Sequence, residues 1–151
     1  MTHLNLNVSA DVAKLILADR LAVFQGQQMD EVLYREMSAH LNANVHPMIG
    51  QGFSVAGNPR SGGVNVEFFT GGNRMTVAID GNEIREREEA VRAEIELLID
   101  AAAQLSKDAV DMSRNLVQGG HGRWLNIANT HLQQGFSALR RAHSEEDPDA
   151  Y

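Results

Sequence analysis

The sequence lacks cysteine and is poor in proline and in aromatic side chains. Its 151 residues include three Pro, five Phe, two Tyr and one Trp. The absence of cysteine excludes disulfides, a cysteine nucleophile and thiolate metal sites. The scarcity of aromatic residues requires a mainly aliphatic core. No apolar run approaches the ~18 residues of a membrane-spanning helix, and the first 15 residues do not resemble a signal peptide. We therefore expect no membrane partner.

Length and charge narrow the possibilities further. A chain of this length predicts one domain or slightly more. Its net charge is −7, from 13 basic and 20 acidic residues, which predicts repulsion of DNA and RNA. Residues 112–144, however, contain four arginines and no Asp or Glu. We interpret this basic window as a local site for a small anion. The alternative is that its arginines pair with acids on the preceding helix.

The clearest periodic pattern predicts a long helix over residues 83–116, with Asn82 as its N-cap and acidic residues in its first turns. Its apolar residues recur at spacings of four and three, as in a heptad seam. The seam consists of Val91, Ile95, Leu98, Ala102, Leu105, Ala109, Met112 and Leu116. A glycine-rich break at residues 118–122 ends this helix, and the pattern predicts a second helix over 123–142.

Two long helices joined by a short loop form an antiparallel hairpin. Such a hairpin cannot bury both of its faces alone, so we expect a homo-oligomer. The alternative is a monomer in which the seam packs on the N-terminal region. The predicted class is α+β, with a mixed helix and β region over 1–82, the hairpin domain over 83–143 and an acidic tail over 144–151.

The N-terminal region predicts two short helices, one opened by Ser9 and running through Val23, the other opened by Asp30 and running to about Leu41. Residues 49–63 are rich in Gly, Ser, Asn and Pro, which predicts a loop.

A β-hairpin is predicted next, from residues 64–70 and 75–80, which flank the turn-forming sequence Gly-Gly-Asn-Arg. Two strands alone do not make a stable sheet. We therefore expect them to pair with a strand around residues 4–8 or 52–55, or with another subunit.

Signatures of catalysis are missing from the sequence. The six histidines lack metal-ligand spacing, and neither a serine nucleophile motif nor a phosphate loop is present. These absences predict a protein that is not an enzyme and has no cofactor or metal. The glycine-rich segment instead places backbone N–H groups and Arg123 at a helix N-terminus, where anions bind. Trp124 follows and offers a surface for base stacking. Alternatively, Trp124 anchors the turn.

Residues 122–142 resemble the C-terminal helix of a family of small phage proteins. The pattern is Arg-Trp at 123–124, Asn-Thr at 129–130, and Gln-Gln-Gly-Phe at 133–136, which continues through Ala142. Members of that family act as cyclic-nucleotide sponges and counter the CBASS and Thoeris bacterial defence systems. With the preceding helix, the resemblance covers about residues 83–143. Residues 1–82 match neither the anti-CBASS nor the anti-Thoeris members closely.

The resemblance implies a non-enzymatic viral protein that sequesters an immune signal in the cytoplasm of the infected bacterium. Its ligand would be a cyclic dinucleotide, a cyclic trinucleotide or a cyclic ADP-ribose isomer. The pockets would lie between subunits of a homo-oligomer, often a hexamer in this family. Arg123 is implied to face phosphate, with Trp124, Asn126 and Thr130 on or next to the same helical face.

Arg85 and Arg87 occupy about the place of the family's other ligand contacts, and the alternative is a solvated helix start rich in Glu–Arg pairs. Gln134, Gly135 and Phe136 are expected to pack, with Gly135 allowing a close helix approach. Three other functions compete with the sponge function. The arginine-rich last helix suggests a DNA-binding phage regulator, and the heptad seam suggests a non-catalytic oligomeric scaffold. The third is an enzyme that degrades cyclic nucleotides, and the missing metal and nucleophile motifs argue against it.

Overall fold

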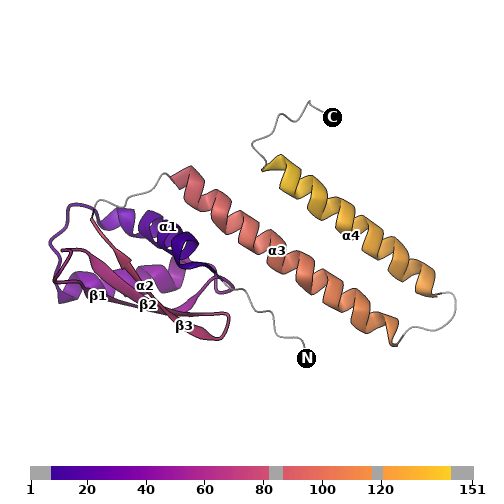
Figure 1. Cartoon of the computed structure of the whole chain (residues 1–151), viewed down its shortest axis with the longest axis horizontal. Helices are drawn as coiled ribbons and strands as arrows, with labels where there is room; N and C mark the ends of the chain where they lie inside the picture. The colour runs from indigo at the N-terminus through magenta and orange to yellow at the C-terminus, as the bar shows by residue number, and fades with distance from the viewer. Residues whose placement is uncertain (1–7, 82–86, 117–120, 144–151) are drawn as a thin grey trace. The chain divides into compact units, whose positions relative to one another are not determined.

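A computed structural model describes residues 8–81, 87–116 and 121–143. Over these residues it contains four α-helices, one short 3₁₀ helix and a three-stranded antiparallel sheet (Figure 1). The predicted α+β class is therefore confirmed. The described residues divide into two compact units. We call residues 8–95 the N-terminal unit and residues 96–143 the hairpin unit.

Two capped helices begin the N-terminal unit, as the sequence predicts. They are α1, Ala10–Leu21, and α2, Glu31–Asn44, with the 3₁₀ helix η1, Ala22–Phe24, directly after α1. Ser9 Oγ accepts a hydrogen bond from the Val12 N–H at 3.2 Å, and Asp30 Oδ1 accepts one from the Leu33 N–H at 2.8 Å. Each cap satisfies an N–H group that has no partner within its helix, and this determines where the helix begins.

The sheet contains the predicted β-hairpin and one further strand. Its strands are β1, Gln51–Gly57, β2, Val64–Thr70, and β3, Asn73–Ile79. They are antiparallel in the order β1-β2-β3, with Val66 of β2 opposite both Val55 and Val77. Gly63 precedes β2 and passes close to β3, because a Cβ at this position would lie 2.0 Å from the Ile79 carbonyl oxygen.

The prediction of a loop over residues 49–63 is wrong for residues 51–57, which form β1. The alternative, a strand around residues 52–55, is confirmed. Phe53 and Val55 are buried, whereas their neighbours in the strand are exposed or half-buried, so the alternation typical of a half-buried strand is present but short. The other proposed partner segment, residues 4–8, lies outside the described residues except for Val8.

Side chains of α2 bond to the outer edge of β1, and this explains how a strand forms in a segment rich in turn-forming residues. The Phe53 N–H donates to Asn42 Oδ1 at 2.9 Å, and Asn42 Nδ2 donates to the Phe53 carbonyl oxygen at 3.1 Å. The Val55 N–H donates to Ser38 Oγ, also at 2.9 Å. These bonds replace a neighbouring strand, and they also block this edge against pairing with another chain.

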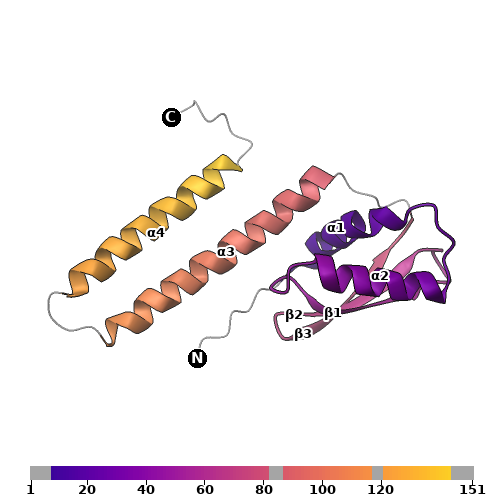
Figure 2. The same ribbon diagram turned by 180° about the vertical axis from the view of Figure 1, so that it is seen from behind.

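One face of the sheet packs against α1 and α2 and forms the core of the N-terminal unit (Figure 2). The rings of Phe53 and Phe68 stack there with their centroids 5.0 Å apart. The largest fully buried side chains are those of Phe68, Ile16, Leu17, Met37, Leu41 and Val66. Burial of each such side chain stabilises the fold by about 1.5–3 kcal/mol. The core is mainly aliphatic, as expected from the scarcity of aromatic residues.

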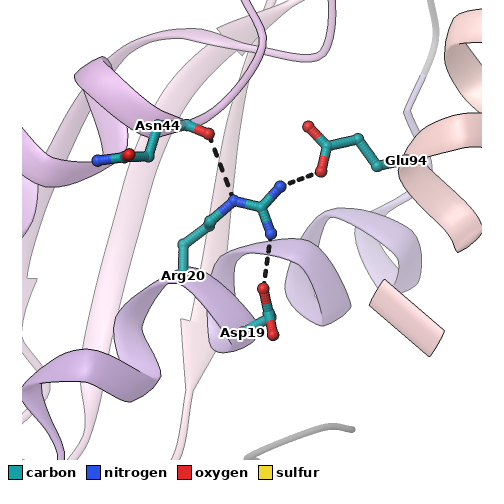
Figure 3. Close-up of polar contacts among 4 residues, drawn as sticks. All are labelled: Asp19, Arg20, Asn44 and Glu94. Carbon is teal, nitrogen blue, oxygen red and sulfur yellow. Dashed lines mark hydrogen bonds and ion pairs between the residues drawn. The ribbon is translucent and has the colours of Figure 1, made fainter. Parts of the chain in front are cut away.

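A cluster of charged side chains joins α1, the end of α2 and the first part of α3, the helix over Arg87–Arg114 (Figure 3). Arg20 Nη1 donates to Asp19 Oδ2 at 2.6 Å, Nε donates to the Asn44 carbonyl oxygen at 3.3 Å, and Nη2 pairs with the carboxylate of Glu94. The Arg20 and Glu94 side chains are only 18% and 12% exposed. Arg20 therefore holds together three elements of the N-terminal unit.

The predicted helical hairpin consists of α3, Arg87–Arg114, and α4, Gly122–Ala142. Polar side-chain contacts between described residues connect the helices. Arg140 Nη2 pairs with Asp100 Oδ1 at 3.2 Å, and Arg114 Nη1 donates to Asn126 Oδ1 at 3.3 Å. Because the later residue of α3 meets the earlier residue of α4, these contacts confirm an antiparallel arrangement. The expected N-cap Asn82, residues 118–120 of the predicted break and the acidic tail over 144–151 lie outside the described residues. The other two residues of the predicted break, His121 and Gly122, are described, and Gly122 is already the first residue of α4.

The apolar seam of the hairpin is largely uncovered in the single chain. Leu105, Met112 and Leu116 of the seam are exposed, and α4 has no buried residue along its whole length. The expectation that Gly135 allows a close helix approach is not met within this chain, since no described atom lies within 4 Å of a Cβ built there. None of the described helices has both the length and the apolar composition needed to span a bilayer.

Candidate functional site

The first turns of α4 carry the residues that the sequence singles out. α4 begins at Gly122 after His121, whose side chain makes no capping hydrogen bond. The first turn contains no acidic residue, whereas Arg140 and Arg141 lie in the last turn, where cations suit the helix dipole. No acidic side chain of its own first turn therefore neutralises the partial positive charge at the N-terminal end of α4.

Arg123, Asn126 and Thr130 lie on one face of α4, because they are spaced by three and four residues. All three are exposed. The Thr130 hydroxyl donates to the Asn126 carbonyl oxygen at 3.0 Å, within the helix. Arg123 makes no hydrogen bond or ion pair with any described residue. Its guanidinium group is therefore available to an external anion.

Arg114 joins this face from the end of α3, through its 3.3 Å hydrogen bond to Asn126 Oδ1. Arg114 is not among the predicted site residues, although it lies in the basic window. Only the pairing of α3 with α4 shows that it meets Asn126. We call Arg114, Arg123, Asn126 and Thr130 the arginine face. Its two guanidinium groups, one amide and one hydroxyl match the donors that bind phosphate oxygens.

Trp124 lies next to the arginine face and not on it, because consecutive residues are turned by about 100° around a helix. Its side chain is 68% exposed. The cation–π contact found among the described residues is that of Arg74 with Phe69, in the N-terminal unit, so Trp124 does not stack on Arg123 here. Nor does Trp124 anchor the turn as a buried residue would. Its large ring is free to contact a base or another chain.

The two arginines proposed near the start of the first long helix are not placed at this site. Arg87 is the first residue of α3 and belongs to the N-terminal unit, where it is exposed. Arg85 lies outside the described residues. The arginine face therefore contains three of the six predicted site residues, Trp124 lies beside it, and the contribution of the two earlier arginines stays a prediction.

The described residues contain no cluster of three or more His, Asp or Glu side chains that would hold a metal ion. Comparisons of the chain with family models, with curated proteins and with solved structures find no match. The arginine face must therefore be interpreted from its own chemistry and from the resemblance of residues 122–142.

Proposed function

We propose that this protein is a non-catalytic viral anti-defence protein, which binds a cyclic nucleotide immune signal and withholds it inside the infected bacterial cell. The observation that carries the proposal is the arginine face, in which Arg123, without a partner among the described residues, lies beside Arg114, Asn126 and Thr130. The resemblance of residues 122–142 to cyclic-nucleotide sponges supplies the ligand class: a cyclic dinucleotide, a cyclic trinucleotide or a cyclic ADP-ribose isomer.

The charge distribution supports a small ligand over a long nucleic acid. The window over residues 112–144 carries a charge of +4, whereas the whole chain carries −7. A short ligand contacts the basic window alone. A long polyanion also meets the acidic remainder and is repelled at low ionic strength. This argues against the alternative of a DNA-binding phage regulator.

We further propose that the hairpin assembles with copies of itself, up to the hexamer that the resemblance implies. In α4, Trp124, Leu132 and Leu139 are exposed. Ala128, Gly135 and Ala142 recur every seven residues beside these large side chains and leave room for a second helix. A 21-residue helix without a buried residue gains little packing energy in one chain, so a covering partner is needed.

A second copy of the chain complements this exposed surface by charge. The second half of α3 carries acidic residues, including Asp108 and Asp111, whereas α4 has none. α4 of one copy against α3 of another therefore brings opposite charges together around the apolar seam. A non-catalytic scaffold without ligand shares this assembly, so only ligand binding separates the two functions.

A thermal-shift screen of the purified protein against the three ligand classes tests the proposal. A ligand at 100 times its Kd stabilises the folded protein by about 2.7 kcal/mol. For a chain of this size that corresponds to a rise in Tm of roughly 5–11 °C. We expect this rise with one class. Ligand recovered intact after denaturation of the complex would show that the protein does not cleave it.

Arg123→Ala is the variant that tests the arginine face, and Arg35→Ala is its matched control. Arg35 is an exposed helical arginine in the N-terminal unit with no partner among the described residues. Loss of one arginine–phosphate contact should weaken binding roughly 10- to 100-fold, and the control should bind normally. No thermal shift with any of the compounds would refute the sponge function and favour the scaffold.

A further inference from the structure

The two edges of the sheet differ in how they are protected against pairing with another chain. The outer edge of β1 is bonded by side chains of α2, and its pairing with β2 shifts register between Gln51 and Ser54. β3 forms the opposite edge, and its pairing with β2 is regular from Asn73 to Ile79. β3 contains no proline and no lysine, and no described residue outside β2 bonds to its backbone.

The hairpin turn before β3 determines which of its backbone groups point outward. Gly71 and Gly72 both have positive φ, 57° and 82°, as in the two-residue turns that favour hairpins. A turn of this type places Thr70 and Asn73 in a hydrogen-bonded pair, and such pairs then alternate along the two strands. The residues of β3 that direct their N–H and carbonyl groups away from β2 are therefore Arg74, Thr76 and Ala78.

The single charged side chain of β3 does not guard this edge, because it is held over β2. Arg74 Nε donates to Glu67 Oε1 at 2.7 Å, and the guanidinium group lies 5.4 Å from the centroid of the Phe69 ring. Charged side chains along an edge are one of the means by which proteins prevent strand pairing. Among the described residues, nothing blocks the outward backbone groups of β3, whereas the edge of β1 is blocked.

We propose that the free edge of β3 pairs with β3 of a second copy, so that one continuous sheet runs through both chains. Two copies joined through the same edge are related by a two-fold axis, and this makes the paired strands antiparallel. The outward N–H and carbonyl groups of each copy then bond to those of the other. This contact lies in the N-terminal unit, so the inference does not rest on the hairpin assembly or on ligand binding.

The charges along β3 favour a second copy as the partner. Arg74 lies at the beginning of the strand, and the exposed Asp80 follows directly after Ile79. Antiparallel pairing sets Arg74 of each copy opposite Asp80 of the other instead of opposite its own equivalent, which would repel it. In this register apolar residues also meet on the helix-covered side of the sheet. Val77 faces Val77 of the second copy, and Met75, which is half-buried in the single chain, faces Ile79.

Cysteine crosslinking of the full-length chain tests the pairing, since the chain contains no cysteine of its own. Ala78 and Ala56 are exposed residues in one cross-strand row, on opposite edge strands, with Asn65 between them. In the proposed pair, the two copies of Ala78 lie about 7–8 Å apart, within reach of a short bismaleimide linker. The two copies of Ala56 lie about 24 Å apart, because five strand spacings separate them.

We expect Ala78→Cys to form a covalent dimer and Ala56→Cys, the matched control, to form at least tenfold less. No dimer from Ala78→Cys, or equal amounts from both variants, would overturn the proposal.

Thr76→Pro tests whether the free edge joins the copies. Proline is tolerated on an edge strand where its missing N–H would face solvent, so the bonds of β3 to β2 are retained. Thr76→Val keeps the N–H and is the matched control. Light scattering should give half the wild-type mass or less for Thr76→Pro and the wild-type mass for Thr76→Val, with circular dichroism showing that both are folded. An unchanged mass in folded Thr76→Pro would overturn the proposal, and so would a monomeric wild-type protein.

This interface and the proposed function fail independently. Arg123→Ala removes a residue of the arginine face and should leave the yield of crosslinked Ala78→Cys unchanged. A crosslink without binding of any cyclic compound supports the sheet interface and refutes the sponge function. Binding of a cyclic compound without the crosslink gives the opposite result.

Discussion

Replacing Arg20 with alanine should strongly destabilise the N-terminal unit. The substitution removes three contacts at once and leaves the carboxylates of Asp19 and Glu94 without their shared cation. Breaking a fully buried ion pair costs about 3–5 kcal/mol. The Arg20 and Glu94 side chains retain 18% and 12% exposure, which lets water reach the orphaned carboxylates. We therefore expect a loss of about 2–3 kcal/mol, or roughly 4–12 °C in Tm.

The assay is thermal unfolding of the full chain, followed by far-ultraviolet circular dichroism. Arg35→Ala is the control, because its side chain is exposed on α2. The double variant Arg20→Ala/Glu94→Ala should lose less than the sum of the single losses, since the pair can be broken only once. A loss below about 1 kcal/mol in Arg20→Ala, or additive losses in the double variant, would refute this account of the cluster.

Two further predictions concern the sheet. Gly63→Ala should lower the free energy of unfolding by about 2 kcal/mol or more, because its Cβ would lie 2.0 Å from the Ile79 carbonyl oxygen. Gly81→Ala, with no described atom within 4 Å of its Cβ, should change it by less than about 0.5 kcal/mol in the same thermal melts. Asn42→Ala should cost about 1–3 kcal/mol, because it frees the N–H and carbonyl groups of Phe53. It should also promote aggregation through the opened edge of β1, measured by light scattering; equal stability and solubility would contradict this role.

Elements whose signals are local could be predicted from the sequence. Ser9 and Asp30 each bond to an N–H three residues later, so the helix starts are readable from short stretches of sequence. The β-hairpin likewise depends on a tight turn between two alternating segments. The same holds for the three residues of the arginine face that lie on α4, because the spacing of Arg123, Asn126 and Thr130 alone places them on one side of a helix.

Features that depend on distant residues could not be predicted. The strand β1 is held partly by Asn42 and Ser38 of α2, which lie 11 and 17 residues before the strand residues they bond to. Because these partners are distant in the sequence, the glycine and serine content of the segment wrongly predicted a loop. The ion pair of Arg20 with Glu94 joins residues 74 apart, and no local pattern signals it. Arg114 was missed at the site for the same reason, since its partner Asn126 lies across the turn of the hairpin.

The heptad seam shows that a pattern can predict a helix correctly and still not show which surface the apolar side chains of that helix contact. The spacing of apolar residues predicted the helices α3 and α4, and both are present. It did not predict the polar contacts of Asp100 with Arg140 and of Arg114 with Asn126. Leu105, Met112 and Leu116 of the seam remain exposed in the single chain, so the pattern that predicts the helices does not show which surface covers them.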